Sequence, residues 1–381
     1  MESGFFMNKN EQVEFEILSD FQEGRKTRRQ AAMLLGVSER AVSRRTKKLR
    51  EQGLRGIKHG NYAKSPSNKI STSLKDEVLA LIKSRYYDFN ISHAHELLRE
   101  EHGFTLSYMT LLKWCRDSGL GNRKKRRTSK ARIQRERMAN EGVLLQMDGS
   151  HHKWNGKDTW CLISVIDDAT SNIPAGQFYH GETSWNCMHL LRRLFTDRGV
   201  PKYLYTDGAG WAGGGGKRQN FSQVVRACKE LGIEIIRAHS AEAKGRIERS
   251  YKTIQGRLIP EMRLKGITTM KDANRFLDQV YWTDWSRRYS VEPRDEIDRY
   301  RRLKPSEDLD KILCIKNDRQ ITSDHSISYG SKRYKVNPGK YGSLKKKTVT
   351  VHEYEDKTFT IYYGAELVEY QEIKIPKRKW I

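Results

Sequence analysis

The order of apolar and amphipathic segments between residues 141 and 260 restricts the fold of this chain more than any other feature of its sequence. Short apolar runs bounded by turn residues predict buried strands, and apolar residues three or four positions apart predict helices. The strands expected on this basis are 143–147, 160–166, 175–179, 203–205 and 233–236. The expected helices are 185–197, 221–231 and 241–258.

Three strands, a helix, a strand, a helix, a strand and a long final helix follow one another in the α/β ribonuclease-H-like fold. In that topology the first and fourth strands are neighbours, and the final helix crosses near their ends. Asp148 ends the first predicted strand and Asp207 follows the fourth, while Glu242 and Glu248 lie in the final helix. We therefore expect Asp148, Asp207 and one of the two glutamates to lie close together.

The choice between the two glutamates depends on the faces of the final helix. Its apolar stripe consists of Ile247, Tyr251, Ile254 and Leu258. Glu248 lies beside this stripe, on a ridge with Lys244, Lys252 and Gln255. Cationic and amide groups around a carboxylate suit a site that faces DNA. Glu242 lies at the helix start, where a carboxylate commonly does no more than favour the helix dipole. Glu248 is therefore preferred, and Glu242 is the weaker alternative.

Three carboxylates at one point repel each other unless cations neutralise them. Carboxylate oxygens are hard ligands that suit Mg²⁺ or Mn²⁺. Two such ions per active site, about 3.5–4 Å apart, would hold the attacking and leaving oxygens of an in-line phosphoryl displacement. Asp148, Asp207 and Glu248 are thus the predicted metal ligands and catalytic residues, with water or a DNA 3′-hydroxyl as nucleophile. Asp167 and Asp168 could add ligands, but carboxylates before a Thr-Ser-Asn turn more often cap that turn.

The charge balance of the chain indicates a polyanionic partner. Its 381 residues include 72 Lys and Arg against 47 Asp and Glu, a net charge of +25. An excess of this size repels itself unless a polyanion compensates it, and nucleic acid is the usual one. No apolar run is long enough to cross a membrane, and the acidic N-terminus is unlike a signal peptide. The five cysteines lack CxxC spacing, so we expect buried free thiols in a soluble protein of the reducing cytoplasm.

Residues 1–60 carry the pattern of a helix-turn-helix DNA-binding domain. One predicted helix ends at Gly36, and Ser38 is a suitable N-cap for the next. A helix, a short glycine-containing turn and a second helix form the helix-turn-helix arrangement. The second helix would present a basic face to a DNA groove. This face consists of Arg40, Arg44, Arg45, Lys47 and Lys48. An ordinary helical hairpin with a solvated basic face is the alternative.

Residues 61–120 predict a second helix-turn-helix-like DNA-binding domain. Its candidate recognition helix, 108–118, carries Lys113 and Arg116. The exposed face of this helix is less basic than that of the first domain. Two such domains in tandem suit a long, bipartite DNA site.

A strongly basic linker at 121–140 follows, with nine basic residues and one acidic residue. This composition favours a segment that runs along DNA phosphates over a solvated helical face. The residues expected to contact DNA are Arg123, Lys124, Lys125, Arg126 and Arg127. Lys244 and Lys252, on the ridge of Glu248, are expected to contact DNA as well.

After the catalytic core, expected at 141–300, the pattern changes to short strands. Alternating segments at 326–336, 348–353 and 359–363 predict a small all-β barrel over residues 301–381. Such a domain would bind DNA nonspecifically or contact a second protomer, and both roles remain open.

Three core segments, LLQMDGSHHKW, LYTDG and AKGRIERSYKTIQGRL, resemble the catalytic segments of DDE-type insertion-sequence transposases, in particular the ISNCY-like group. These transposases share an integrase catalytic core with retroviral integrases, and the resemblance covers roughly three quarters of the chain. It places the acidic triad of the family on Asp148, Asp207 and Glu248. It implies two Mg²⁺ or Mn²⁺ ions, binding to terminal inverted repeats, cleavage of the DNA ends and joining of the 3′-hydroxyls to target DNA. It also implies a homo-oligomer, at least a dimer on DNA, in the nucleoid-associated cytoplasm of a bacterium.

Two other functions remain compatible with the same residues. A ribonuclease-H-like nuclease would cut DNA without joining it, and a catalytically inactive DNA-binding regulator would do neither. The presence of all three carboxylates argues against the regulator. Strand-transfer products would separate the transposase from the nuclease.

Overall fold

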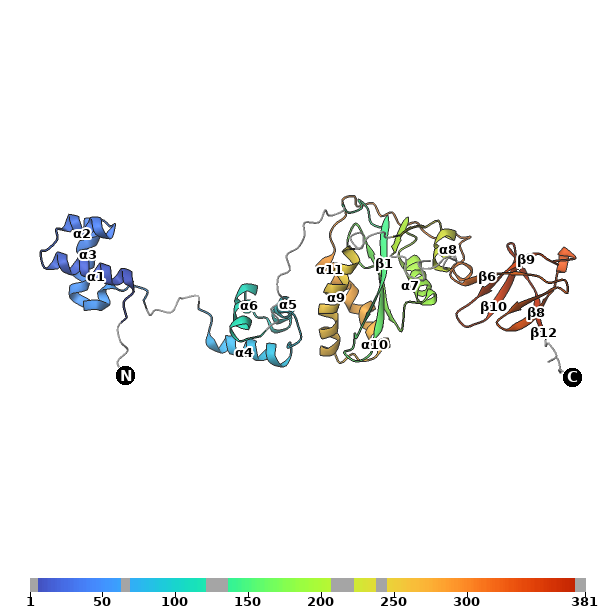
Figure 1. Ribbon diagram of the computed structural model, residues 1–381, viewed down its shortest axis with the longest axis horizontal. Coiled ribbons are helices and arrows are strands. Elements are labelled where there is room, and N and C mark those ends of the chain that lie inside the picture. Colours follow the sequence, from blue (N-terminus) through green and yellow to red (C-terminus); the bar gives the residue numbers. More distant parts are fainter. Residues whose placement is uncertain (1–5, 63–68, 121–135, 207–222, 238–244, 374–381) are drawn as a thin grey trace, which may run out of the picture. The chain divides into compact units, whose positions relative to one another are not determined.

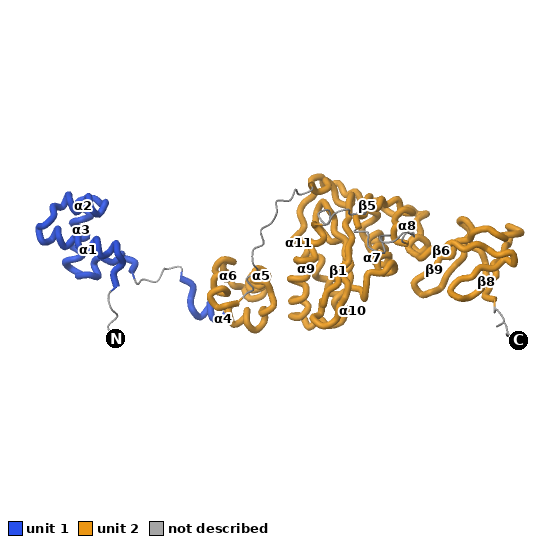
Figure 2. The backbone as a smooth tube through the Cα atoms, in the orientation of Figure 1, with its two compact units in different colours: residues 1–77 blue, residues 78–381 orange. Residues whose placement is uncertain are grey.

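The computed structural model describes residues 6–62, 69–120, 136–206, 223–237 and 245–373. The chain divides into two compact units, Met1–Glu77 and Val78–Ile381, which Figure 2 draws in different colours. Within the described residues, no helix is both long and apolar enough to cross a membrane.

The first unit contains three helices, α1 (Lys9–Gln22), α2 (Arg28–Leu35) and α3 (Glu39–Gln52), followed by a 3-10 helix, η1 (Gly53–Ile57). Their buried core consists of Leu18, Ala31, Ala32, Val42, Leu49 and Ile57. As predicted, α2 ends at Gly36, whose φ of 63° is readily adopted by glycine. Ser38 caps α3, because its hydroxyl accepts a hydrogen bond from the Ala41 amide.

A second helical segment contains α4 (Thr72–Ser84), α5 (Ile91–His102) and α6 (Tyr108–Asp117). Side chains of Asn90 and Ser107 cap α5 and α6, and each accepts a hydrogen bond from a first-turn amide. Helices α5 and α6 pack against each other. From α5 onward the segment belongs to the second unit.

The central part of the chain, predicted as the catalytic core, is built on a five-stranded sheet (Figure 1). Its strands are β1 (Leu144–His152), β2 (Trp160–Asp167), β3 (Ala175–Tyr179), β4 (Tyr203–Thr206) and β5 (Glu234–Arg237), in the order β3-β2-β1-β4-β5. The first three strands are antiparallel neighbours, whereas β4 runs parallel to β1 and β5 parallel to β4. This is the topology of a ribonuclease-H-like core, as predicted from the order of the segments.

Helices cover both faces of the sheet, as Figure 1 shows. On one face, α7 (Ser184–Asp197) and α8 (Gln223–Glu230) pack with β1 and β2 around one apolar cluster. The other face carries α9 (Gly245–Leu264), α10 (Met270–Phe276), the π-helical turn η4 (Leu277–Tyr281) and α11 (Trp282–Tyr289) around a second cluster. Every residue of β2 is buried, because the strand contributes side chains to both clusters. A strand covered on both faces is expected to be mostly apolar in sequence.

Helix α9 buries the predicted apolar stripe. Its members Ile247, Tyr251, Ile254 and Leu258 are all buried. The helix extends to Leu264, beyond the expected end at Leu258, and contains Pro260 in its interior. Proline has no amide hydrogen, so it cannot donate to the carbonyl four residues earlier, that of Gly256. The Asn90 side chain supplies the missing donor, with Nδ2 3.3 Å from the Gly256 carbonyl oxygen.

The C-terminal segment consists of short strands, as predicted, and these form two antiparallel sheets. One contains β6 (Ile315–Gln320), β9 (Thr348–Glu353), β10 (Phe359–Tyr363) and β11 (Glu366–Val368). The other contains β7 (Ser326–Tyr329), β8 (Lys332–Val336) and β12 (Tyr370–Ile373). The strand expected at 326–336 is therefore a hairpin. It turns at Gly330 and Ser331, whose positive φ values of 53° and 61° suit a two-residue turn.

All five cysteines are buried free thiols, as expected. Burial raises the pKa of each thiol. They are Cys115, Cys161, Cys187, Cys228 and Cys314.

Candidate active site

The first predicted catalytic residue, Asp148, lies in β1 opposite Ser164 of β2. Strand β1 also pairs in parallel with β4, and the last of these pairs joins Gln146 to Tyr205. In sequence, Asp148 and Asp207 each follow this last pair by two residues. Asp207 lies outside the described residues, which end at Thr206 in this part of the chain.

One face of β1 is directed toward α9. Alternate residues of a strand point to the same face, which for β1 groups Gln146, Asp148 and Ser150. Ser150 Oγ accepts a hydrogen bond of 3.1 Å from Gln255 Nε2 of α9. Gln146 is buried and donates from Nε2 to the Asp168 carboxylate at 2.9 Å. Asp148 therefore lies between Gln146 and Ser150 on this face. Ser150 contacts α9 directly, and Gln146 contacts Asp168.

Tyr251 joins α9 directly to the backbone of Asp148. Its hydroxyl donates a hydrogen bond to the Asp148 carbonyl oxygen and accepts one of 3.0 Å from Ser164 Oγ. Burial, and then the charge of Asp148, raises the pKa of Tyr251 well above its usual value. The hydroxyl thus keeps its proton and remains a donor. Because Tyr251 follows Glu248 by three residues in α9, this bond positions the turn that carries Glu248 against β1.

Asp168 makes the second connection between β1 and α9. Its carboxylate is fully buried and lies just beyond the end of β2. Oδ1 accepts hydrogen bonds from Gln146 Nε2 at 2.9 Å and from Arg246 Nη1 at 2.5 Å, and Oδ2 accepts one from the Met138 amide at 3.0 Å. Gln146 precedes Asp148 by two residues, and Arg246 precedes Glu248 by two. One buried carboxylate therefore connects the neighbourhoods of both candidate catalytic residues.

Glu248 lies in the first turn of α9 and is exposed. A carboxylate there is favoured by the positive end of the helix dipole. Arg246 and Tyr251, on either side of it in sequence, hold this turn against the sheet. The alternative, Glu242, lies outside the described residues.

Asp167 caps a turn, as predicted. Its Oδ1 accepts hydrogen bonds from the amides of Ala169 and Thr170, both 2.9 Å, and from the Thr170 hydroxyl, while Oδ2 accepts one from the Gly142 amide. Burial raises the pKa of Asp167, although these donors act in the opposite direction. The carboxylate of Asp168 also accepts hydrogen bonds from more distant parts of the chain, namely β1, α9 and Met138.

No group of three His, Cys, Asp or Glu side chains close enough to hold a metal ion occurs among the described residues. Of the three predicted ligands, only Asp148 and Glu248 belong to that part of the chain. The fit of a metal therefore rests on the oxygen donors of these two residues, which are of the kind that Mg²⁺ prefers.

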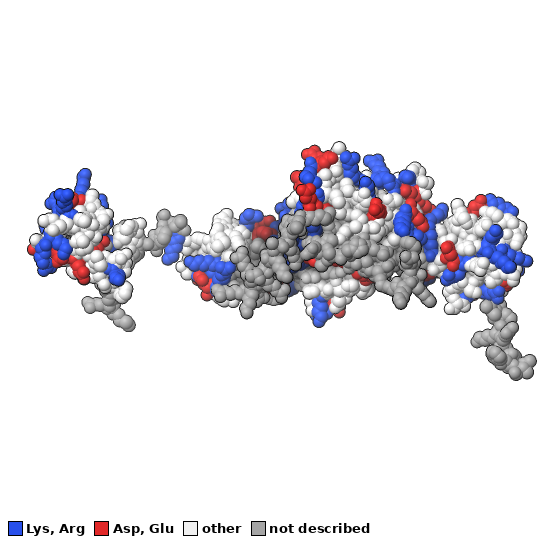
Figure 3. Space-filling model, turned by 45° about the horizontal axis from the view of Figure 1, so that its top comes forward, with Lys and Arg blue, Asp and Glu red and all other residues white. Residues whose placement is uncertain are grey.

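The predicted DNA-binding residues of α3 fall into two groups. Arg40, Arg44 and Lys47 are exposed along one ridge of the helix. In contrast, Arg45 Nη1 pairs with Glu14 of α1 at 2.9 Å, and Lys48 Nζ donates to the Lys58 carbonyl oxygen. Figure 3 shows blue patches of Lys and Arg on the first unit.

The remaining predicted DNA contacts are only partly described. Lys113 and Arg116 are exposed on α6, and Lys252 is exposed on α9. Arg123, Lys124, Lys125, Arg126, Arg127 and Lys244 lie outside the described residues.

The hydrogen bonds that join Gln146, Asp168 and Arg246 were not predicted, although Gln146 carried a sequence signal for them. It is a polar residue inside the apolar run of β1, and a buried polar side chain requires a hydrogen-bond partner. The sequence alone does not identify that partner, since Asp168 and Arg246 are 22 and 100 positions away from it.

Two curated proteins are similar to nearly the whole chain, although no protein-family model matches it. The putative transposase y4bF of Sinorhizobium fredii is 32% identical over 378 residues, which cover 96% of this chain and 81% of that protein. The transposase for insertion sequence IS1202 of Streptococcus pneumoniae is 26% identical over 412 residues, which cover 95% of this chain and 87% of that protein.

Solved structures with some similarity come from retroviral integrases. The catalytic core domain of HTLV-2 integrase in complex with magnesium matches 37% of this chain and 89% of its own, with 18% identity and a TM-score of 0.29. The simian T-cell lymphotropic virus intasome in complex with a PP2A regulatory subunit matches 79% of this chain and 100% of its own, with 13% identity and a TM-score of 0.34.

Proposed function

Because this chain belongs to the insertion-sequence transposases, we propose that it binds the terminal inverted repeats of its element, cleaves the DNA ends and joins the 3′-hydroxyls to target DNA. The observation that carries this proposal is the double connection between β1 and α9. Tyr251 and Asp168 together hold the strand of Asp148 against the first turn of α9, which carries Glu248. Phosphoryl transfer needs such fixed acidic groups, because misplaced ligands lose most of their catalytic effect.

Asp148, Asp207 and Glu248 are the proposed ligands of two Mg²⁺ or Mn²⁺ ions. When bound, such ions neutralise the charge that develops on the phosphate and activate the attacking oxygen. Arg246 would remain paired with Asp168 and keep the start of α9 in place. Tyr251, a donor over the working pH range because its pKa is raised, would hold the Asp148 backbone.

DNA recognition is assigned to the two helical parts of the chain. The exposed ridge of Arg40, Arg44 and Lys47 on α3 is proposed to enter a DNA groove of the terminal repeat. Lys113 and Arg116 on α6 would contact a second part of the same repeat. Since two ends must be held together for joining, the active form is proposed to be at least a dimer on DNA.

The test uses the full-length protein, a labelled duplex of the DNA that flanks its own gene, and a target plasmid. Reactions contain Mg²⁺ or EDTA. We expect cleaved and joined products that require the metal and are absent for Asp148→Asn, Asp207→Asn and Glu248→Gln. Each variant should still bind the duplex, because the helical parts supply that affinity separately. Glu242→Gln is the matched control and should remain active.

Other outcomes would change the assignment. Cleavage without joined products would indicate a nuclease, and binding without cleavage would indicate a regulator. An inactive Glu242→Gln with an active Glu248→Gln would move the third acidic residue to position 242. Glutamate in place of both Arg44 and Lys47 should weaken end binding more than the same change at Arg45, whose guanidinium is already paired with Glu14.

A further inference from the structure

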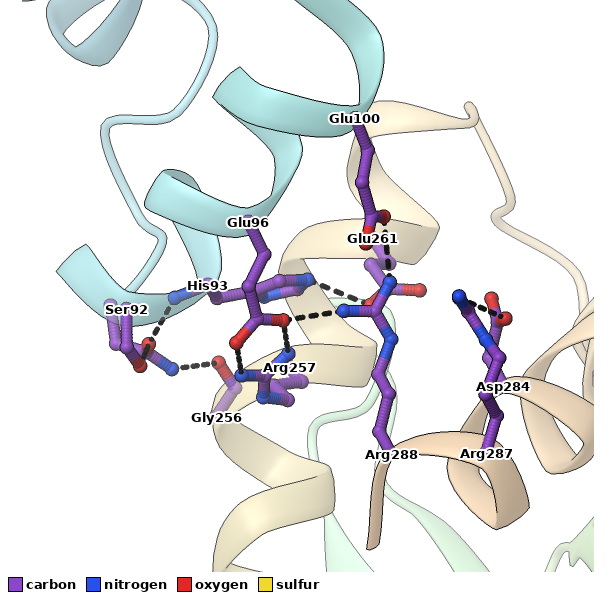
Figure 4. Close-up of polar contacts among 11 residues, drawn as sticks. Ser92, His93, Glu96, Glu100, Gly256, Arg257, Glu261, Asp284, Arg287 and Arg288 are labelled. Atoms are coloured by element: carbon purple, nitrogen blue, oxygen red, sulfur yellow. Dashed lines mark hydrogen bonds and ion pairs between the residues drawn. The ribbon is translucent and has the colours of Figure 1, made fainter. Parts of the chain in front are cut away.

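Helix α5 contacts the catalytic core through one charged face. His93, Glu96 and Glu100 recur three and four residues apart, so they lie on the same side of the helix. Figure 4 shows these side chains directed toward α9 and α11. Another side of α5 carries the buried Ala94 and Leu98. The helix thus has one side for burial of apolar groups and another for the core.

Glu96 is at the centre of this contact. Its carboxylate accepts two hydrogen bonds from the Arg257 guanidinium of α9, at 2.8 and 2.7 Å, and one of 2.6 Å from Arg288 Nη1 of α11. Arg288 Nη2 also donates to Glu100 at 2.7 Å. Bidentate arginine–carboxylate pairs are directional as well as strong, so the Arg257–Glu96 pair fixes the orientation of α5.

Burial makes the central pair difficult to separate. Arg257 is only 8% exposed. Burial alone would raise the pKa of Glu96, but the hydrogen bonds and charge of Arg257 and the charge of Arg288 outweigh it, and the pKa is lowered. A buried charge that loses its partner is strongly destabilising. The arginines of the core are therefore matched to an acidic partner, which α5 provides.

A second group of contacts lies at the start of α5. Arg263 of α9 makes two hydrogen bonds to the Asp88 carboxylate, at 2.8 and 2.7 Å, and its guanidinium lies 4.4 Å from the Tyr87 ring centre. The Asn90 side chain donates to the Gly256 carbonyl, the one that Pro260 leaves without an amide donor. The helical segment therefore completes the hydrogen bonding of α9 itself.

The docking face and the proposed DNA-binding face of the segment are different. On α6, the exposed Met109, Lys113 and Arg116 lie four and three residues apart on one ridge. On α9, Glu248 and Arg257 are nine residues apart, which at 3.6 residues per turn places them on opposite sides of the helix. Glu96 of α5 thus docks on the side of α9 away from Glu248, while the Asp88–Arg263 pair lies about four turns beyond Glu248 along α9. The ridge of α6 remains accessible.

We propose that α5 fixes the second helical segment to α9 and thereby sets the distance between the DNA held by α6 and the active site. This inference rests on the proposed function. The intervening chain at 121–135 has fifteen residues and could reach about 50 Å when fully extended. Successive phosphates of one DNA strand are only about 3.4 Å apart along the axis. The length of this segment alone therefore does not select one phosphodiester, whereas a docked helix can.

The test compares docking with the position of cleavage in the full-length protein. Glu96→Gln removes the central charge without changing the shape, and Asp88→Arg reverses the exposed pair at the edge. Hydrogen exchange of residues 256–264 should accelerate by more than about tenfold in both variants, because α9 loses its partner. Combining Asp88→Arg with Arg263→Asp restores an opposite-charge pair and should return exchange toward that of the unmodified protein.

The matched control reverses a pair that lies away from this interface. Asp272 and Arg275 form an exposed ion pair of 3.2 Å within α10. Exchanging their charges should leave the exchange rates of 256–264 and the cleavage position unchanged. The end duplex is then cleaved with each protein and the products are sized to the nucleotide.

We expect one cleavage position for the unmodified protein, the control and the exchanged Asp88/Arg263 pair, and several positions for Glu96→Gln and Asp88→Arg. Unchanged hydrogen exchange in both variants would overturn the docking. Faster exchange with a single cleavage position would overturn the role in positioning. If the unmodified protein cleaved no DNA, the proposed function and the positioning role would both fall, and hydrogen exchange would still decide whether α5 docks.

Discussion

Replacement of Asp168 by asparagine tests whether the buried link between β1 and α9 positions the active site. The groups that bond to its carboxylate, Gln146 Nε2, Arg246 Nη1 and the Met138 amide, are all donors. Asparagine keeps the shape of the side chain but exchanges one acceptor oxygen for an NH₂ group. One donor would therefore face another donor, and Arg246 would lose its opposite charge.

The magnitude follows from the burial of the pair. A buried ion pair that loses one partner costs about 3–5 kcal/mol. The Arg246 side chain is 19% exposed and keeps some contact with water, so we expect the lower end, about 3 kcal/mol of the free energy of unfolding. The first turn of α9 would also lose its anchor, and a displacement on the order of 1 Å at Glu248 would slow the chemistry about 100-fold.

Asp167→Asn is the matched control for this substitution. Asp167 is equally buried and accepts four hydrogen bonds, none of them from α9. Urea unfolding gives the stability of both variants, and Mn²⁺-dependent cleavage of the end duplex gives their activity at a temperature where both are folded. We expect both to lose stability, but only Asp168→Asn to lose cleavage and to need more metal. Cleavage by Asp168→Asn within about threefold of the unmodified rate would refute the reasoning.

Three further outcomes are expected. Tyr251→Phe removes the bond to the Asp148 carbonyl and should cost about 1–2 kcal/mol in urea unfolding together with part of the cleavage rate; an unchanged rate would contradict a positioning role. Gly176→Ala should destabilise the core, since a Cβ would lie 2.5 Å from the Trp282 ring, and a thermal midpoint equal to that of the unmodified protein would show this contact to be wrong. Burial and nearby positive charges lower the pKa of His352 from 6.5 to about 4; the unfolded state therefore takes up the proton first, and stability should fall between pH 6.5 and 4, but less so in His352→Gln.

The order of elements in the core could be predicted because it depends on local patterns. Apolar runs marked the five strands, and the stripe beginning at Ile247 marked the buried side of α9. The helix cap at Ser38 and the turn at Asp167 could also be predicted, because caps and turns involve residues a few positions apart. Periodicity indicates which face of an element is buried, and this information was sufficient for the topology.

The links between distant elements could not be predicted in the same way. Spacing shows that Glu96 lies on one face of a helix, but not that Arg257, 161 positions later, covers that face. Arg45 was predicted as a DNA contact from the basic face of its own helix, and that pattern does not reveal its pairing with Glu14 of another helix. The hairpin at Gly330 was missed although the apolar positions change phase across it, from Ile327 and Tyr329 to Tyr334 and Val336.

The burial of all five cysteines has a practical consequence for labelling. The thiolate is the reactive form of cysteine, and burial raises the pKa of every one of these thiols. Maleimide reagents should therefore leave the folded protein nearly unmodified. A single cysteine introduced at an exposed position that is not a proposed DNA contact, such as Asp117 on α6, should take up a fluorophore selectively without removal of the native thiols. Fluorescence could then follow the helical segment while the protein assembles on DNA.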